Sequence, residues 1–199
     1  MAKTTKHKSL YERFQEEYLA VKEPCANRNG FRIRYVYYGK WYLWDKPEAE
    51  LLKTKRMMLL EAIAAAAAWV LTAVCPSGLN SLPFVAFPAI ASLCALLLML
   101  FGVGQFCLAG YRTTRSNFED ADRRMRLYAL LYLLSTAAAA LGCLFYQLRY
   151  GVDLPGAAVL VGNAVQAALA AQIRRQYRNI PVTTERNDTI YHVEPAMPE

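Results

Sequence analysis

The sequence predicts an all-α membrane protein: a bundle of four transmembrane helices, preceded by a small cytoplasmic helix and a segment able to form a β-hairpin. Two observations lead to this fold class. The chain of 199 residues is 55% hydrophobic, and its apolar residues gather in four stretches, each near the roughly 20 residues that cross a bilayer as a helix. In addition, 22 of the 23 Lys and Arg residues lie on one side of these stretches.

The charge asymmetry predicts how the chain threads through the membrane. The predicted spans are residues 57–75, 83–108, 127–146 and 154–171. The segment before the first span holds 13 basic residues, the link between the second and third holds five, and the C-terminal tail holds four. The remaining two links hold only Arg149. Because basic residues stay on the cytoplasmic side, both termini are expected in the cytoplasm, most simply at the cell membrane.

This topology divides the chain into a cytoplasmic N-terminal module (1–56), a transmembrane domain (57–173) and a cytoplasmic tail (174–199). The module begins with a predicted amphipathic helix over about residues 10–22. Ser9 and Glu12 have the spacing of a capping box, which marks a helix start. The apolar residues that recur there at helical spacing are Leu10, Phe14, Tyr18 and Val21. The helix could lie on the membrane or dock on protein, and its acidic polar face favours protein.

An aromatic segment follows. Residues 31–37 alternate as a strand does, and Gly39-Lys40 could turn the chain into a second strand over 41–44. Six residues of this segment are Tyr or Trp: Tyr35, Tyr37, Tyr38, Trp41, Tyr42 and Trp44. They can form a belt at the membrane interface, a protein-binding surface or a platform for a planar ligand. Nearness to the first span favours the belt, followed by the binding surface.

The helices themselves show start signals and small residues. Asp45, Pro47 and Glu48 form a helix N-terminus, so the first helix should begin in the cytoplasm and continue into the membrane. Helices in lipid associate where small residues permit close approach. Two pairs have the required four-residue spacing: Ala138 with Gly142, and Ala158 with Gly162.

Polar residues within the spans gather at one depth, in the inner leaflet. This predicted polar layer consists of Glu61, Gln105, Tyr132, Ser135, Asn163 and Gln166. As the one acid inside a span, Glu61 is a functional candidate by default. It could form a cytoplasm-facing site for a proton, a cation or a small polar molecule. The favoured interpretation is hydrogen bonding between helices, with Glu61 reaching the surface or accepting hydrogen bonds from Gln105 or a tyrosine.

The functional prediction depends on which sequence motifs are absent. The chain has no HExxH, GxSxG or Walker motif and no CxxC pair, and His7 and His192 are far apart. We therefore expect no enzyme activity, no metal site and no cofactor. No recognition motif accompanies the net charge of +7, which argues against nucleic acid. The sequence predicts a membrane subunit or anchor that presents its aromatic module to a protein partner or a second copy. The alternative is a small transporter or channel built around Glu61.

Overall fold

The computed structural model describes residues 17–25 and 30–187. The described chain is mostly helical, with small strands. Its long helices are α2 (Glu48–Val74), α3 (Pro83–Leu108), α4 (Arg115–Tyr150) and α5 (Leu154–Arg178). All four are long and apolar enough to cross a membrane. They overlap all four predicted spans, which confirms the prediction of four membrane-spanning segments at the level of length and composition.

The strands are β1 (Tyr18–Pro24), β2 (Phe31–Tyr37), β3 (Trp41–Trp44), β4 (Arg112–Thr113) and β5 (Val182–Glu185). They make a two-stranded sheet, β1-β2, and a three-stranded sheet in the order β4-β3-β5. The chain is therefore mostly helical rather than all-helical.

Contacts divide the chain into two compact units. The helical unit contains residues 44–111 and 119–181, and the strand unit contains the described residues before, between and after those ranges. The chain thus enters the helical unit before α2, leaves it after α3, returns within α4 and leaves it after α5. This grouping follows contacts, whereas the predicted boundaries at 56 and 173 follow the membrane, and the membrane-based division stays a prediction.

Local sequence explains where the helices begin and end. Pro83 is the first residue of α3, a position where the missing N–H of proline costs nothing. At the start of α5, the side chain of Asp153 accepts a hydrogen bond from the backbone N–H of Gly156 at 3.1 Å. The last turn of α5 carries Arg175 and Arg178, whose positive charge favours the negative end of the helix dipole.

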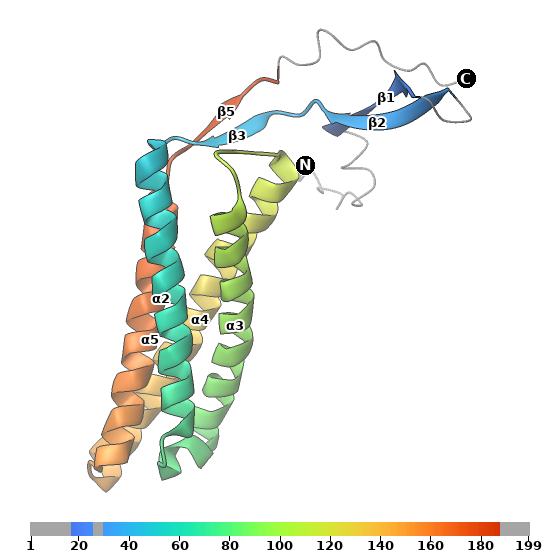
Figure 1. Ribbon diagram of the computed structural model, residues 1–199. Helices are drawn as coiled ribbons and strands as arrows, with labels where there is room; N and C mark the ends of the chain where they lie inside the picture. The colour runs from blue at the N-terminus through green and yellow to red at the C-terminus, as the bar shows by residue number, and fades with distance from the viewer. Residues whose placement is uncertain (1–16, 26–29, 188–199) are drawn as a thin grey trace, which may run out of the picture. The chain divides into compact units, whose positions relative to one another are not determined.

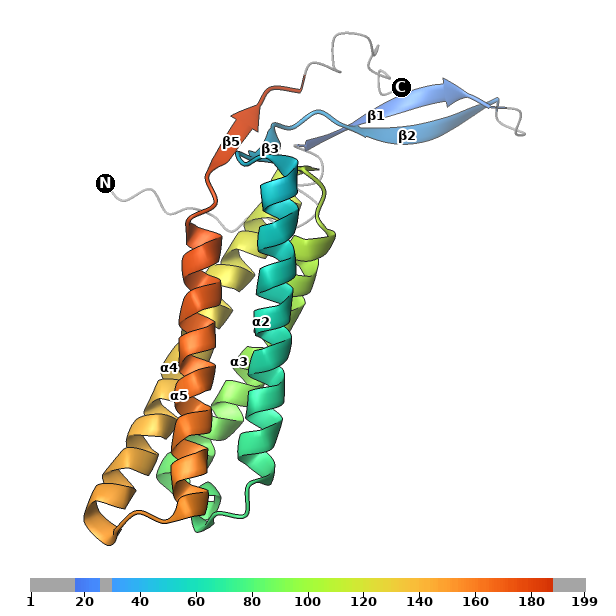
Figure 2. The same ribbon diagram turned by 60° about the vertical axis from the view of Figure 1, so that its left-hand side comes forward.

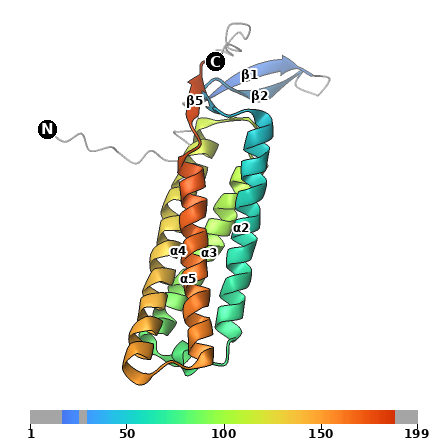
Figure 3. The same cartoon turned by 90° about the vertical axis from the view of Figure 1, so that its left-hand side faces the viewer.

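The four helices lie side by side (Figure 1, Figure 2 and Figure 3). Among the long helices, α2 packs against both α5 and α3. Glycines permit close approach at two predicted places: a Cβ at Gly162 would collide with Thr72 Oγ1, and one at Gly142 would lie 3.0 Å from the carbonyl oxygen of Phe84. Ala138 and Ala158 are exposed instead. The paired-residue prediction is therefore right for the glycines and wrong for the alanines.

The two-stranded sheet is an antiparallel hairpin that runs from Tyr18 opposite Tyr37 to Pro24 opposite Phe31 (Figure 2). Next to the pair of Pro24 and Phe31, the backbone N–H of Cys25 donates a hydrogen bond to the carbonyl of Gly30, at 3.0 Å. Gly30 has a φ of +70°, a conformation that glycine adopts without strain. We call this element the β1–β2 hairpin.

The predicted N-terminal helix is wrong from Tyr18 onward, although Glu17, the first described residue, is helical as predicted. Residues from Tyr18 onward, which were expected to complete it, form β1 instead. The remainder of the predicted helix, residues 10–16, lies outside the described residues. The physical reason is the partner strand: seven residues of β2 pair with β1 over its full length, and this long-range ladder outweighs local helical spacing.

The predicted hairpin has the right strands but the wrong partners. β2 pairs with β1, whereas β3 pairs with β4 and β5. The link between β2 and β3 is occupied by the side chain of Tyr37. Its hydroxyl donates to the carbonyl of Lys40 at 2.7 Å, and a Cβ at Gly39 would meet its ring. Gly39 therefore accommodates an aromatic ring here and does not form a two-residue turn.

Low pH should weaken the ion pairs that Glu23 forms on one face of the β1–β2 hairpin. Glu23 accepts hydrogen bonds from Arg34 at 2.9 Å and from Arg32 at 2.9 Å. Hydrogen bonds from Arg34 and then Arg32 hold the pKa of Glu23 below its usual value of 4.5. A carboxyl with a lowered folded pKa contributes stability above its unfolded pKa, and this is lost as the pH falls through the folded value.

A ¹³C titration of the Glu23 carboxyl should therefore show a midpoint below 4.5. The variant Arg34→Gln should move that midpoint upward, because it removes the strongest interaction. An identical midpoint in both proteins would show that the ion pair does not form in solution.

Candidate functional site

The carboxylate of Glu61 is buried in the helical unit. It belongs to α2 and is 7% exposed. Its Oε1 accepts hydrogen bonds from Nε2 of Gln172 and Nε2 of Gln176, each at 2.6 Å. These glutamines are four residues apart on α5 and therefore share one face of that helix. Oε2 of Glu61 is buried and has no hydrogen-bond partner in the described part of the chain.

The partners of Glu61 differ from those predicted. Gln105 does not contact it by any hydrogen bond found among the described residues, and Oε1 of Gln105 is itself buried and unpartnered there. Gln172 and Gln176 were missed because they follow residue 171, where the predicted fourth span ends. Their four-residue spacing in a helical continuation of that span was the signal that could have found them.

A second set of polar groups joins three helices. The hydroxyl of Tyr132, on α4, donates to Oε1 of Gln166, on α5, at 3.0 Å. Nε2 of Gln166 then donates to Oγ1 of Thr72, on α2, at 3.1 Å. Tyr132 and Gln166 are fully buried. Hydrogen bonds of this kind hold transmembrane helices together, and Thr72 takes part although it was not among the residues of the predicted polar layer.

The other residues of the predicted layer bond within their own helices. Ser135 Oγ donates to the carbonyl of Leu131 at 2.8 Å, and Asn163 Nδ2 donates to the carbonyl of Val159 at 2.9 Å. The six residues therefore form no single site. Glu61 with its two glutamines is one group, and Tyr132 with Gln166 is another.

The aromatic segment contributes to the interiors of both units. Trp44 is 1% exposed and packs edge-on against Phe106 and Tyr177, with ring centroids 5.0 and 6.2 Å apart. Tyr37 is buried in the strand unit, between the rings of Tyr18 and Trp41. In the same unit, Tyr42 stacks on Phe118 at 4.7 Å. These four predicted surface aromatics thus have packing partners within the chain.

Tyr35 and Tyr38 remain exposed. Tyr35 lies on the same face of β2 as Phe31 and Ile33, because side chains two residues apart point the same way. These three residues are 57%, 39% and 55% exposed, respectively. We call them the hairpin face. Sequence reasoning grouped the aromatics by composition and overlooked Phe31 and Ile33, although alternation along the strand placed all three together.

Tyr37, the last residue of β2, connects the hairpin to the rest of the strand unit by hydrogen bonds. Besides donating to Lys40, its hydroxyl accepts a hydrogen bond from the backbone N–H of Arg115 at 3.1 Å. Its carbonyl accepts from Asn187 Nδ2 at 2.6 Å. Burial raises the pKa of Tyr37, so the phenol stays neutral and continues to donate at physiological pH.

Replacing Tyr37 with phenylalanine should therefore destabilise the strand unit. The variant keeps the ring but leaves the carbonyl of Lys40 and the N–H of Arg115 without this partner, a loss of about 1–3 kcal/mol. Amide hydrogen exchange at Arg115 should become faster. Tyr38→Phe is the matched control, since Tyr38 is exposed, and equal exchange rates in the two variants would contradict the assigned role.

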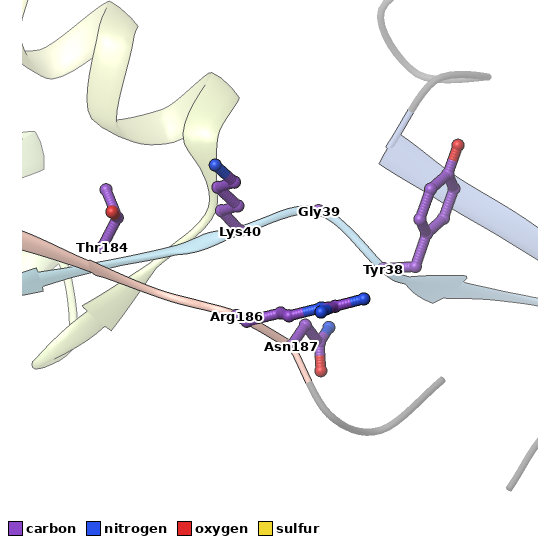
Figure 4. A pocket seen from close by; sticks show the side chains of 6 residues that line it. All are labelled: Tyr38, Gly39, Lys40, Thr184, Arg186 and Asn187. Carbon is purple, nitrogen blue, oxygen red and sulfur yellow. The ribbon is translucent and has the colours of Figure 1, made fainter. Parts of the chain in front are cut away.

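A cavity of about 510 Å³ lies within the strand unit. Figure 4 shows that its lining comes from two segments, the β2–β3 link and the residues that end and follow β5. The lining residues are Tyr38, Gly39, Lys40, Thr184, Arg186 and Asn187. The described part of its lining includes two cationic side chains, those of Lys40 and Arg186.

Among the described residues, no group of three or more His, Cys, Asp or Glu side chains is placed to hold a metal ion. No protein-family model matches this chain, and no curated protein and no solved structure matches it.

Proposed function

We propose that this chain is a multi-pass protein of the cell membrane, with both termini in the cytoplasm, that anchors its strand unit there for a protein partner. The four long apolar helices support the membrane assignment, and the distribution of 22 of 23 basic residues supports the orientation. β3, β4 and β5 occur in the three segments that carry these 22 basic residues: the segment before the first predicted span, the link between the second and third, and the C-terminal tail. The same rule therefore assigns the strand unit to the cytoplasm.

The hairpin face carries the proposal. A two-stranded hairpin is marginally stable in water without further packing, yet this one exposes Phe31, Ile33 and Tyr35 together. Each of its strands also has an outer edge that no other described strand pairs with, which is a template for strand addition. An apolar face beside open strand edges is suited to a protein that supplies both side chains and a backbone edge.

The opposite face argues for protein over lipid as the occupant. Binding to anionic lipid gains from free basic side chains near the apolar surface. In this hairpin Arg32 and Arg34 are both engaged by Glu23, which reduces their attraction for lipid phosphate. On the hairpin face itself, Lys22 pairs with Ile33 and its Nζ lies 5.3 Å from the centre of the Phe31 ring. Beside this one lysine, the aromatic and aliphatic side chains of β2 provide the main contact, as they do at protein interfaces.

Photo-crosslinking from position 35 in native membranes tests this proposal. We expect a crosslink to a distinct protein, and Phe31→Thr with Ile33→Thr should abolish it while preserving strand propensity. Val21→Thr is the matched control, because Val21 belongs to the same hairpin but faces the other way, opposite Arg34. Crosslinks to lipid or to a second copy, or equal yields from the two variants, would contradict a separate protein partner.

Cysteine labelling tests the orientation. On a background retaining only one cysteine, an impermeant maleimide added to intact cells should label Ser81→Cys and Val152→Cys, both exposed in links on the side poor in basic residues. It should label Cys25, which is exposed in the strand unit, only after the cells are opened. The reverse pattern would overturn the topology and with it the cytoplasmic location of the hairpin face.

A transporter or channel is the second candidate function, and Glu61 favours it. A carboxylate that is buried between apolar helices, with Oε2 unpartnered in the described part of the chain, can take up a proton or a cation. The two glutamines that hold Oε1 account for a structural role equally well. Substitutions at Glu61 separate these functions.

A further inference from the structure

A cavity of about 250 Å³ lies between α4 and the C-terminal part of α5. The residues that line it are Leu133, Ala171, Arg174, Arg175, Arg178 and Asn179. Three arginines thus border one small cavity, together with an asparagine. This is a concentration of positive charge and of hydrogen-bond donors around a space between two helices.

No carboxylate among the described residues forms an ion pair with these three arginines. Other arginines of the chain do have such partners: Arg126 pairs with Asp122 at 2.7 Å, and Arg112 pairs with Glu185 at 3.3 Å. Furthermore, Nε of Arg174 is buried without a hydrogen-bond partner in the part of the chain that the structure describes. A buried donor without an acceptor is costly, and an anion in the cavity would supply that acceptor.

The helix dipole alone does not explain this arrangement. Favourable interaction with the C-terminal end of α5 accounts for Arg175 and Arg178 being in its last turn. It does not account for the buried Nε of Arg174 or for a cavity whose other wall is α4. A bound anion accounts for both.

The apolar part of the lining indicates the kind of anion. Leu133 and Ala171 border the cavity beside the arginines, and Leu130 and Ala137, which are partly exposed, lie on the same face of α4 as Leu133. A ligand that fits both parts has a charged group for the arginines and a hydrocarbon chain for the leucines. Basic pockets between transmembrane helices bind lipid headgroups in this way.

We propose that the cavity between α4 and α5 binds a phosphate ester, and that its source is an anionic phospholipid. Planar guanidinium groups bind phosphate oxygens through paired hydrogen bonds, and Asn179 adds a neutral donor. This site goes beyond the proposed partner function and does not depend on it, since the hairpin face belongs to the strand unit. A soluble phosphate ester offers the same phosphate without the acyl chain, and binding experiments distinguish the two sources.

Native mass spectrometry of the full chain in neutral detergent tests the site, with phosphatidylglycerol, phosphatidylcholine and glycerol 3-phosphate as probes. The wild type should retain phosphatidylglycerol in preference to phosphatidylcholine. Arg175→Gln with Arg178→Gln should weaken phosphatidylglycerol binding about tenfold or more. Arg56→Gln with Arg123→Gln is the matched control: it removes the same charge from two exposed arginines outside the cavity and should bind as the wild type does.

Arg174→Lys adds a test that keeps the net charge. It should also weaken binding, because lysine lacks the planar fork, and it decides the matter if the double variant does not fold. Binding of glycerol 3-phosphate with the same dependence on these residues, without binding of phosphatidylglycerol, would retain the phosphate site but assign it a soluble source. Equal losses in the two double variants, or no binding of either probe, would overturn the proposal.

Discussion

Replacing Gly162 with leucine is expected to separate α5 from α2 and to lower the stability of the helical unit by about 3 kcal/mol. A Cβ at this position collides with Oγ1 of Thr72 on α2, and overpacking of this kind costs about 1–3 kcal/mol. The same hydroxyl accepts a hydrogen bond from Gln166. Displacing the Thr72 hydroxyl therefore also breaks its hydrogen bond with Gln166, which in turn bonds to Tyr132. This loss adds about 1 kcal/mol to the destabilisation.

Gly104→Leu is the matched control for this prediction. Gly104 lies within α3, and a Cβ there meets no atom within 4 Å. The two variants make the same chemical change inside a helix, so their difference isolates the contact between α2 and α5. Thermal unfolding in detergent should show a clear loss for Gly162→Leu and little change for Gly104→Leu. Equal midpoints would mean that the close approach at Gly162 does not support the fold.

The helices could be predicted because their determinants are local. Apolar length reports membrane crossing directly, and the second predicted span, residues 83–108, coincides with α3 because Pro83 marks its start. The glycine contacts at 142 and 162 were also predictable, since only glycine permits such close approach of two helices. Helical spacing alone could not show that Ala138 and Ala158 point outward, because it depends on the rotation of each helix against its neighbours.

The strand pairing and the site partners could not be predicted, because both depend on residues far apart in the sequence. β3 is paired by β4, which lies about 70 residues later. The aromatic composition of its segment predicts that Trp44 lies at the membrane interface. Trp44 is instead buried by packing against Phe106 and Tyr177. Gln172 and Gln176 reach Glu61 across more than 100 residues. In each case a packed neighbour decides the role of the residue.

Glu61 should tolerate glutamine but not leucine. In Glu61→Gln the side-chain carbonyl can still accept from Gln172 and Gln176, so stability should remain close to that of the wild type. Glu61→Leu removes the acceptor and leaves two amide donors unpaired, at a cost of about 2 kcal/mol, because only part of that loss can be recovered from water. Unfolding midpoints in detergent would measure the difference.

Gln105→Leu is a control of opposite sign. Its Oε1 is buried without a partner among the described residues, so replacing it with an apolar side chain of similar size should leave stability unchanged or raise it. If Gln105→Leu and Glu61→Leu were equally harmful, the hydrogen bonds to Glu61 would not be what matters at that position.

Glu61→Gln also separates the two candidate functions, because it keeps the fold and removes the ionisable group. If the chain is an anchor, this variant should retain the crosslink from position 35 at the wild-type yield. If Glu61 carries a proton or a cation, reconstituted vesicles should show a flux in the wild type that Glu61→Gln abolishes while remaining folded. A folded variant that loses flux and keeps the crosslink would assign Glu61 to transport and leave the hairpin face as the partner-binding surface. Equal behaviour in both assays would leave Glu61 with the structural task that Gln172 and Gln176 indicate: holding α2 against α5.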